Sequence, residues 1–264
     1  MNKMISHQLN HILNNKTLGS SELVQLLNSY LLSVHTNTTE IKKTVRLAKI
    51  KLGHFEAVNS YLNRLNTLLK GKSDSELINY LMGYSSKENE KIETMFNKVY
   101  PKLKKMRSVI TLSRSFTVLG ILKLWYQKNR KLKVVVCESR PNFEGRLTAK
   151  ELEDVGIKVE LITDAMMGIY VSKTDAAIIG ADVVLKNGNV VNKVGSKALA
   201  LFCQEYKKLF FVVTSKSKFS KKIIFKPRKE NPKEILDKKV KNLTASNIYF
   251  EEIQKKLITK IFTD

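Results

Sequence analysis

Residues 176–198, AAIIGADVVLKNGNVVNKVGSKA, decide how the rest of the chain is understood. The run Ala176–Ile179 is apolar at every position, which predicts a buried strand, and Asp182 follows closely behind it. Asn187-Gly188 favours a tight turn, so a short hairpin is expected after the carboxylate. Asn192-Lys193 then precedes a glycine-marked helix start. A strand ending on a carboxylate, followed by an amide and a cation at a helix start, is typical of a small anionic-ligand site.

Apolar strands and helices alternate on both sides of this stretch. Strands are expected over 108–113, 132–139, 158–164 and 209–215, and helices over 116–127, 145–156, 165–173 and 196–208. Near-continuous apolar strands, each followed by a helix, predict a parallel sheet that is covered on both faces. We therefore predict a Rossmann-like α/β domain over residues 106–264, with a further strand at 247–253 and a last amphipathic helix over 254–262. No G-x-G-x-x-G turn follows the first strand, so a dinucleotide site is not expected.

Residues 1–105 carry helical periodicity and no strand pattern. Apolar residues recur at helical spacing in five segments, 20–34, 38–52, 55–71, 73–84 and 87–105. Ser20 or Ser21 can cap the first of them. The predicted fold class is thus α/β, with a helical N-terminal domain followed by the Rossmann-like domain.

Composition limits the function classes. No apolar run is long enough to span a membrane, and the first residues, MNKMISHQLNHILNN, lack a signal-peptide pattern. We therefore expect a cytoplasmic protein without a membrane partner. Cys137 and Cys203 lie in apolar patterns and are expected to be core residues. The sequence gives no reason to expect a metal or a cofactor.

The formal net charge is +23, and residues 215–241 hold eleven Lys or Arg against three acidic residues. This charge allows an RNA- or ribosome-associated role. A generally lysine-rich surface is the simpler interpretation, because few aromatic residues interleave and no nucleic-acid-binding motif is present. Nucleic acid is therefore not expected as the main partner.

Polar residues follow each predicted strand of the sheet. Ligands of open α/β sheets bind beyond the carboxyl ends of the strands, so these positions are expected to line one crevice. They are Ser113, Arg114 and Ser115, then Glu138, Asp164, Asp182 and Lys218.

Several of these residues also have a purely structural interpretation. Ser113 and Ser115 could cap the following helix, and Asp164 could cap the helix after it. Glu138 could pair with Arg140 and fix their loop. Asp182 is harder to explain in this way, because a strand-like segment rather than a helix follows it.

The chain from about Gly19 to Asp264 resembles the family that unites the α, β and δ subunits of translation initiation factor 2B with two sugar-phosphate isomerases. These are methylthioribose-1-phosphate isomerase and archaeal ribose-1,5-bisphosphate isomerase. The resemblance rests on ESRPNFEGRLTAKEL, ITDAMMGIY, GADVVLKNGNVVNKVGSKALAL and the SKSKF segment. It implies a helical domain on a Rossmann-like domain, assembled as homodimers or higher oligomers.

The resemblance also assigns roles to residues. The isomerases' catalytic aspartate falls on Asp182, their phosphate-binding Asn-Lys pair on Asn192 and Lys193, and a late lysine on Lys218. Their catalytic cysteine falls on Ser113.

Two phosphate-binding features are altered. The isomerases' early Arg-Gly turn matches Leu18-Gly19-Ser20, so the glycine and the helix start are kept while the arginine is lost. A second substrate arginine aligns with His54.

An unactivated serine cannot ionise near neutral pH as an assisted thiol can. The branch that the chain then resembles is that of the archaeal initiation factor 2B subunit-like proteins. We expect a regulatory protein that binds a phosphorylated sugar or nucleotide and acts through a translation-factor partner. An aldose–ketose isomerase acting on a pentose 1-phosphate is the alternative, with the basic RNA-associated factor as the second.

Overall fold

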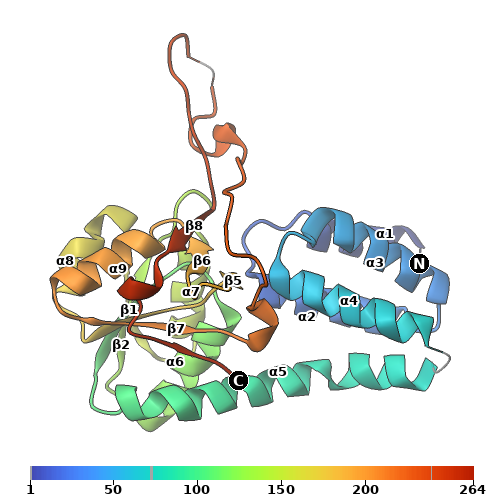
Figure 1. Ribbon diagram of the computed structural model, residues 1–264, viewed down its shortest axis with the longest axis horizontal. Helices are drawn as coiled ribbons and strands as arrows, with labels where there is room; N and C mark the ends of the chain where they lie inside the picture. The colour runs from blue at the N-terminus through green and yellow to red at the C-terminus, as the bar shows by residue number, and fades with distance from the viewer. Residues whose placement is uncertain (1, 72–73, 239) are drawn as a thin grey trace.

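The computed structural model describes residues 2–71, 74–238 and 240–264. Residue 73, where the fourth expected helix starts, and residue 239 in the basic segment lie outside the described residues. Five helices come first: α1 (Asn2–Leu13), α2 (Ser20–Ser33), α3 (Thr38–Leu52), α4 (Glu56–Lys70) and α5 (Asp74–Leu103). Figure 1 shows α1–α4 as a bundle beside a layered α/β part, with α5 running along both.

The α/β part begins with β1 (Ser108–Leu112), α6 (Phe116–Lys128), β2 (Lys133–Cys137), α7 (Glu144–Glu153) and β3 (Lys158–Ile162). It continues with η1 (Asp164–Met166), α8 (Met167–Val171), β4 (Ala176–Ile179), β5 (Val183–Val184) and β6 (Val190–Lys193). The last elements are α9 (Ser196–Glu205), β7 (Leu209–Val213), η2 (Lys216–Lys218), η3 (Pro232–Glu234), β8 (Phe250–Ile253), η4 (Lys255–Leu257) and β9 (Lys260–Phe262).

Six strands form one parallel sheet in the order β3-β2-β1-β4-β7-β9. Strand order reverses between β1 and β4, the position at which open α/β sheets form a ligand crevice. The predicted fold class is confirmed. A small antiparallel sheet, β5-β6-β8, contains the expected hairpin, with Gly188 at φ +84° in its turn.

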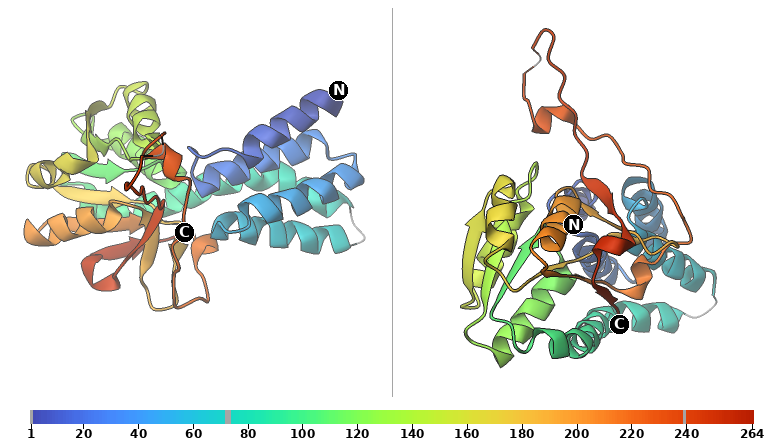
Figure 2. Two further views of the ribbon diagram at one scale, coloured as in Figure 1. Left: turned by 90° about the horizontal axis from the view of Figure 1, so that it is seen from above. Right: turned by 60° about the vertical axis from the view of Figure 1, so that its left-hand side comes forward.

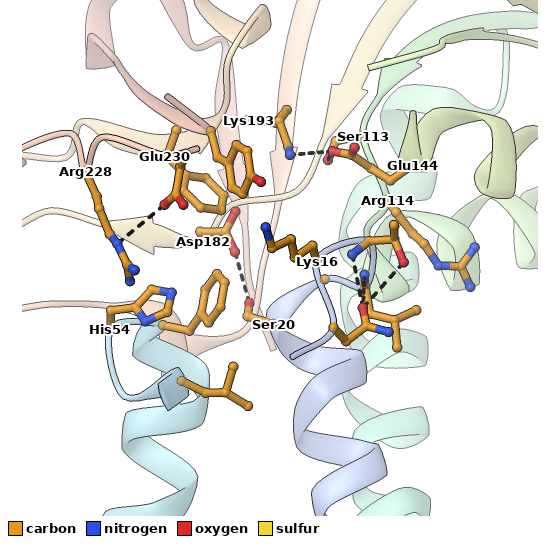
Figure 3. Close-up of a pocket in the computed structure, with 18 of the residues that line it drawn as sticks. Lys16, Ser20, His54, Ser113, Arg114, Glu144, Asp182, Lys193, Arg228 and Glu230 are labelled. Atoms are coloured by element: carbon orange, nitrogen blue, oxygen red, sulfur yellow. Dashed lines mark hydrogen bonds and ion pairs between the residues drawn. The ribbon is translucent and has the colours of Figure 1, made fainter. Parts of the chain in front are cut away.

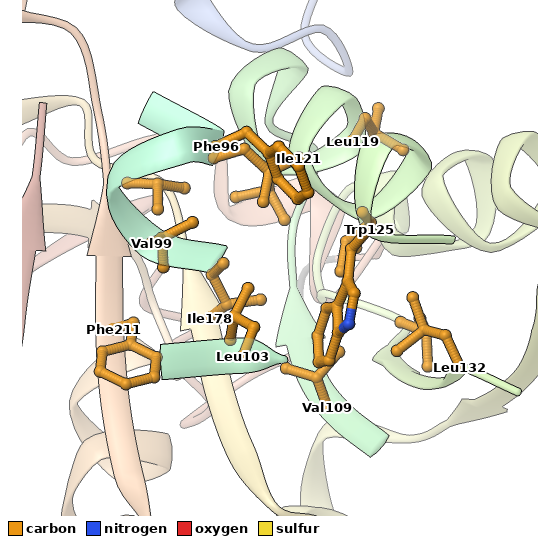
Figure 4. Close-up of a cluster of buried hydrophobic side chains, with 14 of the residues drawn as sticks. Phe96, Val99, Leu103, Val109, Leu119, Ile121, Trp125, Leu132, Ile178 and Phe211 are labelled. Carbon is orange, nitrogen blue, oxygen red and sulfur yellow. The ribbon is translucent and has the colours of Figure 1, made fainter. Parts of the chain in front are cut away.

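Alternate side chains of each buried strand enter two different cores, as the period of a strand requires. On one face of the sheet, Val109 and Ile178 pack with Trp125 and with the second half of α5 (Figure 4). On the other face, Ile110 and Ile179 pack under α8 and α9. Helices therefore cover both faces (Figure 2).

Two expected elements are wrong in their extent or type. The segments 73–84 and 87–105 belong to a single 30-residue helix, α5, rather than two helices. Residues 254–262 form η4 and then β9, which pairs in parallel with β7, rather than a helix. The side chains of Phe262 and Ile261 serve opposite faces of the sheet, which explains why this segment looked amphipathic.

Helix α5 contributes to two cores. Its Leu77 and Leu81 pack among α1–α4, whereas Phe96, Val99 and Leu103 pack against the sheet. The division of the chain near residue 105 stays a prediction, since one helix serves both parts. Residues 221–238 and 240–247, hereafter the arm, connect η2 to β8, and the far part of the arm projects from the rest of the molecule (Figure 1). None of the described helices is long and apolar enough to cross a membrane.

Candidate functional site

A cavity of about 270 Å³ lies between the helical bundle and the carboxyl edge of the large sheet (Figure 3). Its charged and titratable lining residues are Lys16, Lys51, His54, Arg114, Glu144, Asp182, Lys193, Arg228 and Glu230. A pocket of about 20 Å³, roughly the space of one water, adjoins it. The two share Gly19, Ser20, Ser113, Arg114 and Asp182.

Ser113 stands at the end of β1 in the left-handed region, at φ +64°. Its hydroxyl donates to Glu144 Oε1 at 2.8 Å, and the same oxygen lies 2.7 Å from Lys193 Nζ. The Glu144 and Lys193 side chains are only 3% and 7% exposed, so this is a buried ion pair. Glu144 Oε2 is also buried and has no hydrogen-bond partner among the described residues. Such an oxygen is costly to bury, and the residue that carries it is part of the cavity lining.

Lys193 is held from a second direction by aromatic rings. Its ammonium lies 4.7 Å from the centre of the Tyr249 ring and 5.7 Å from that of Phe250. Contacts of this kind stabilise a cation without neutralising it. Neighbouring Asn192 donates to Ser196 Oγ at 2.9 Å, so its amide fixes the start of α9. The predicted Asn-Lys pair is thus built into the site, although only Lys193 lines the larger cavity.

Asp182 faces the start of α2. Its Oδ1 accepts a hydrogen bond from Ser20 Oγ at 3.0 Å, a contact between residues 162 positions apart. Gly19 caps α2 and lies so close to the loop after β1 that an added Cβ would be 2.8 Å from the carbonyl oxygen of Arg114. The N-terminus of α2, with its unpaired N–H groups and positive dipole end, is therefore directed at the same cavity.

Lys218 lies at the end of η2, in the wall of the small pocket. Burial lowers the pKa of its ammonium, against the opposing influence of Asp182, Glu88 and Glu22. Among the described residues this ammonium has no hydrogen bond or ion pair. A buried cation without a close counter-ion is expensive, and such groups concentrate at functional sites.

Arg114, a predicted ligand-binding residue, is turned away from the cavity (Figure 3). Its guanidinium lies 2.8 Å from Glu22 Oε1 and 2.6 Å from Glu151 Oε2. These contacts tie α2 of the helical part to α7 of the sheet part. Because the Arg114 guanidinium is paired with both carboxylates, the side chain serves as a structural link between the two helices. Arg114 borders the cavity only because the loop after β1 does.

Of the remaining predicted residues, Ser115 lines the small pocket and also has a local role, while Asp164 and Glu138 have local roles alone. Ser115 caps α6 by accepting from the Val118 N–H, one of the two interpretations that the sequence left open. Asp164 does not cap its helix; its carboxylate accepts from the backbone N–H groups of Ser139 and Arg140 at 2.9 and 2.7 Å. The expected pair of Glu138 with Arg140 is wrong.

Arg146, in the first turn of α7, contacts the Glu138 carboxylate instead, at 2.8 Å. Both guanidinium groups lie over the ring of Phe143, Arg146 at 3.9 Å and Arg140 at 4.7 Å, and only that of Arg146 also forms an ion pair with Glu138 among the described residues. Neither Glu138 nor Asp164 lines the cavity or its small neighbour.

Sequence reasoning missed several lining residues. Glu144 stands inside the segment EGRLTAKEL, yet its importance depends on Lys193, 49 positions away. Lys16 and Arg228 come from loops with no periodic pattern. His54, two residues before α4, does line the cavity, and burial, with help from Arg228, lowers its pKa.

The family model described as "Initiation factor 2 subunit family" matches residues 6–264. A "putative translation initiation factor eIF-2B subunit 2-like" protein of Pyrococcus furiosus is 43% identical over 118 residues, 45% of this chain and 43% of the relative. A ribose 1,5-bisphosphate isomerase of Archaeoglobus fulgidus is 31% identical over 61% of this chain and 58% of its own length. The chain thus aligns with about half the length of these relatives.

A longer match is the ribose 1,5-bisphosphate isomerase of Methanocaldococcus jannaschii, which is 28% identical over 90% of this chain and 81% of its own length. The crystal structure of translation initiation factor eIF-2B from Pyrococcus horikoshii superposes with a TM-score of 0.80, at 23% identity over 98% of this chain and 94% of that chain. At this identity the structural likeness concerns the fold alone. Since the family model spans nearly the whole sequence, this chain belongs to the initiation factor 2 subunit family.

Proposed function

We propose that the protein binds a phosphorylated sugar or nucleotide in the cavity between its helical and sheet parts. The single observation that carries the proposal is that two buried cations flank the N-terminus of α2: Lys193 lines the cavity, Lys218 lines the small adjoining pocket, and Gly19 and Ser20 line both. Buried cations and free helix N–H groups are the groups that phosphate oxygens accept from.

The proposed role is regulatory rather than catalytic. Where the isomerases that this chain resembles have a cysteine, the chain has Ser113, and the hydroxyl of Ser113 donates to a carboxylate. A carboxylate is too weak a base to deprotonate a serine, so Ser113 is not an activated nucleophile. Ligand binding would instead change the contacts that the protein makes with a translation-factor partner or a second copy of the chain.

The test compares binding of sugar phosphates and nucleoside monophosphates to two variants. Lys193→Met alone would leave Glu144 buried without its counter-ion and destabilise the fold, so both variants carry Glu144→Gln. We expect Lys193→Met in this background to weaken phosphate-ligand binding by about tenfold or more, the value of one charge-assisted contact. If no phosphorylated compound raises the melting temperature of the wild-type protein, the proposal fails.

An aldose–ketose isomerase is the second candidate, favoured by two carboxylates in the cavity. Glu144 offers a buried carboxylate next to the serine position, and Asp182 offers another beside α2. Moving a proton between adjacent carbons needs one group to remove it and one to assist at oxygen. Turnover of ribose 1,5-bisphosphate or methylthioribose 1-phosphate that is lost in Asp182→Asn would establish this activity, and no turnover would exclude it for these substrates.

A further inference from the structure

The amino-terminal edge of the large sheet, opposite the cavity, carries a second charged surface. A groove of about 640 Å³ lies there, lined by the residues that precede or begin β1, β2, β3 and β4. Seven of its lining residues are Lys or Arg, and one, Asp175, is acidic. Helix α5 ends at this edge, on the side of the sheet part away from α1–α4 (Figure 1).

The parallel topology explains how residues distant in sequence form one row. Arg107 directly precedes β1, while Lys133 and Lys158 begin β2 and β3, and the starts of parallel strands share one edge. Lys133 and Lys158 are direct partners in the register of β2 and β3. Adjacent strands lie about 4.8 Å apart, so these cations are neighbours along the row. Like charges in direct register weaken a sheet, which gives this arrangement a cost in the free protein.

These cations have no carboxylate partners. None of the seven makes an ion pair with any residue that the structure describes. Asp175 Oδ2 accepts hydrogen bonds from the backbone N–H groups of Arg107 and Ser108 and from the Ser108 hydroxyl, at 2.8 to 2.9 Å, so this carboxylate is tied to the start of β1. Arg130 and Lys173 only lie over nearby tyrosine rings, at 4.6 and 5.2 Å.

The negative ends of the helix dipoles are too weak to balance the positive charge of this groove. Helices α5, α6, α7 and α8 all run against the strands and end near this edge. Each helix end carries about half a negative charge, so together they supply about two. Asp175 adds one more, and a surplus of several positive charges is left over the groove.

We propose that this groove, hereafter the basic edge groove, binds the phosphate backbone of a nucleic acid. The only apolar side chain in its lining is Leu132, which is 1% exposed, so the groove offers no apolar anchor. Protein interfaces are depleted of lysine at their centres and rely on apolar or aromatic residues there. Rows of exposed Lys and Arg are instead what phosphate backbones contact, without reading sequence.

Of the two surfaces rich in lysine and arginine, the basic edge groove is a stronger candidate for binding nucleic acid than the arm. In the arm, Arg228 has Glu230 at 3.6 Å. Lys218, just before the arm, is buried and faces the cavity wall. The cations that the sequence grouped at 215–241 are therefore partly committed within the protein.

Two matched variants test the proposal, each removing four exposed cations. The edge variant carries Arg107→Gln, Lys131→Gln, Lys133→Gln and Lys158→Gln, and the arm variant carries Lys221→Gln, Lys233→Gln, Lys238→Gln and Lys241→Gln. Binding of a labelled oligouridine RNA and of a duplex RNA, each about 20 nucleotides long, is followed by fluorescence anisotropy between about 50 and 200 mM salt. Both variants must first unfold cooperatively, with melting temperatures no lower than that of the wild type.

We expect the edge variant to bind at least about tenfold more weakly, with a salt slope on the single strand smaller by roughly 0.7 for each phosphate that is no longer neutralised. The arm variant should stay within about threefold of the wild type. Equal losses of affinity in both variants would mean that net charge alone attracts RNA, and would overturn the proposal. It is equally overturned if the wild type binds neither RNA, or if polyglutamate or anionic lipid vesicles compete more strongly than RNA.

Discussion

At the scale of single residues, the site is dominated by two buried charges that the fold does not fully satisfy. Glu144 keeps one oxygen without a partner among the described residues, and Lys218 has its pKa lowered by burial. Groups of this kind lower stability and persist where function needs them. Each gives a prediction about the balance between stability and binding.

Glu144→Gln is expected to tighten the binding of a phosphorylated ligand. In the wild type the carboxylate holds Lys193 at 2.7 Å and presents a buried negative oxygen at the cavity wall. The amide keeps the size of the side chain but removes the repulsion toward phosphate and frees the ammonium. Isothermal titration should show an affinity gain of about tenfold, or 1.4 kcal/mol. Glu144→Asp, which keeps the charge, should show no gain; a gain there would assign the effect to shape.

Lys218→Met is expected to stabilise the fold while weakening ligand binding. An ammonium with a lowered pKa in the folded state binds a proton less well than in the unfolded chain, so the wild type is penalised below that pKa. Urea unfolding near pH 7 should therefore give a gain of about 1 to 2 kcal/mol for the variant. The gain should shrink as pH rises toward 10.5, the ordinary pKa of lysine. A gain that does not change with pH would point to packing instead.

Sequence reasoning reached some of these residues because their signal is local. Asp182 and Lys218 follow strands of the parallel sheet, whose carboxyl ends converge, and Lys193 lies just before the glycine-marked start of α9. Arg114 follows a strand too, but its direction is set by Glu22 and Glu151, on helices distant in sequence. Long-range pairs of this kind leave no trace in local periodicity.

At the scale of elements, α5 and β9 show where periodic patterns fail. The polar run around residues 84–89 suggested a joint, yet polar residues also suit the exposed face of a long helix. Segment 254–262 has too few residues to separate helical from strand period, and pairing with β7 decides the outcome. Tertiary contacts, rather than local helix or strand propensity, determine the continuity of α5 and the strand conformation of β9.

Gly83→Ala tests whether α5 is continuous. Within a helix, alanine is favoured over glycine by about 0.5 to 1 kcal/mol, and an added Cβ at Gly83 would meet only Lys87 Cε at 3.8 Å. We expect the free energy of unfolding in urea to rise by about this amount. Gly120→Ala in α6 is the control, because its Cβ would lie 2.8 Å from Ile92 Cγ2 and should destabilise the protein. A loss of stability in Gly83→Ala would instead place a break in the helix there.

At the scale of the whole molecule, net charge acts against folding. A charge of +23 on 264 residues repels itself, and compaction brings the charges closer. The pairs that link the two parts, such as Arg114 with Glu22, are largely shielded from solvent, with exposed fractions of 13% and 12%. Salt screens exposed charges strongly and buried pairs weakly. Added salt should therefore relieve the repulsion more than it weakens these links.

We accordingly expect sodium chloride to stabilise the protein, by about 1 kcal/mol between roughly 50 and 500 mM, where the Debye length shrinks severalfold. Urea unfolding at each concentration measures this, whereas guanidinium chloride would supply salt itself. The edge variant of the basic edge groove lowers the charge by four, from +23 to +19, and removes cations in direct register. Its stability should be higher at low salt and its gain from salt smaller than that of the arm variant. If both variants respond alike, the repulsion is spread over the surface and the row of cations carries no special cost.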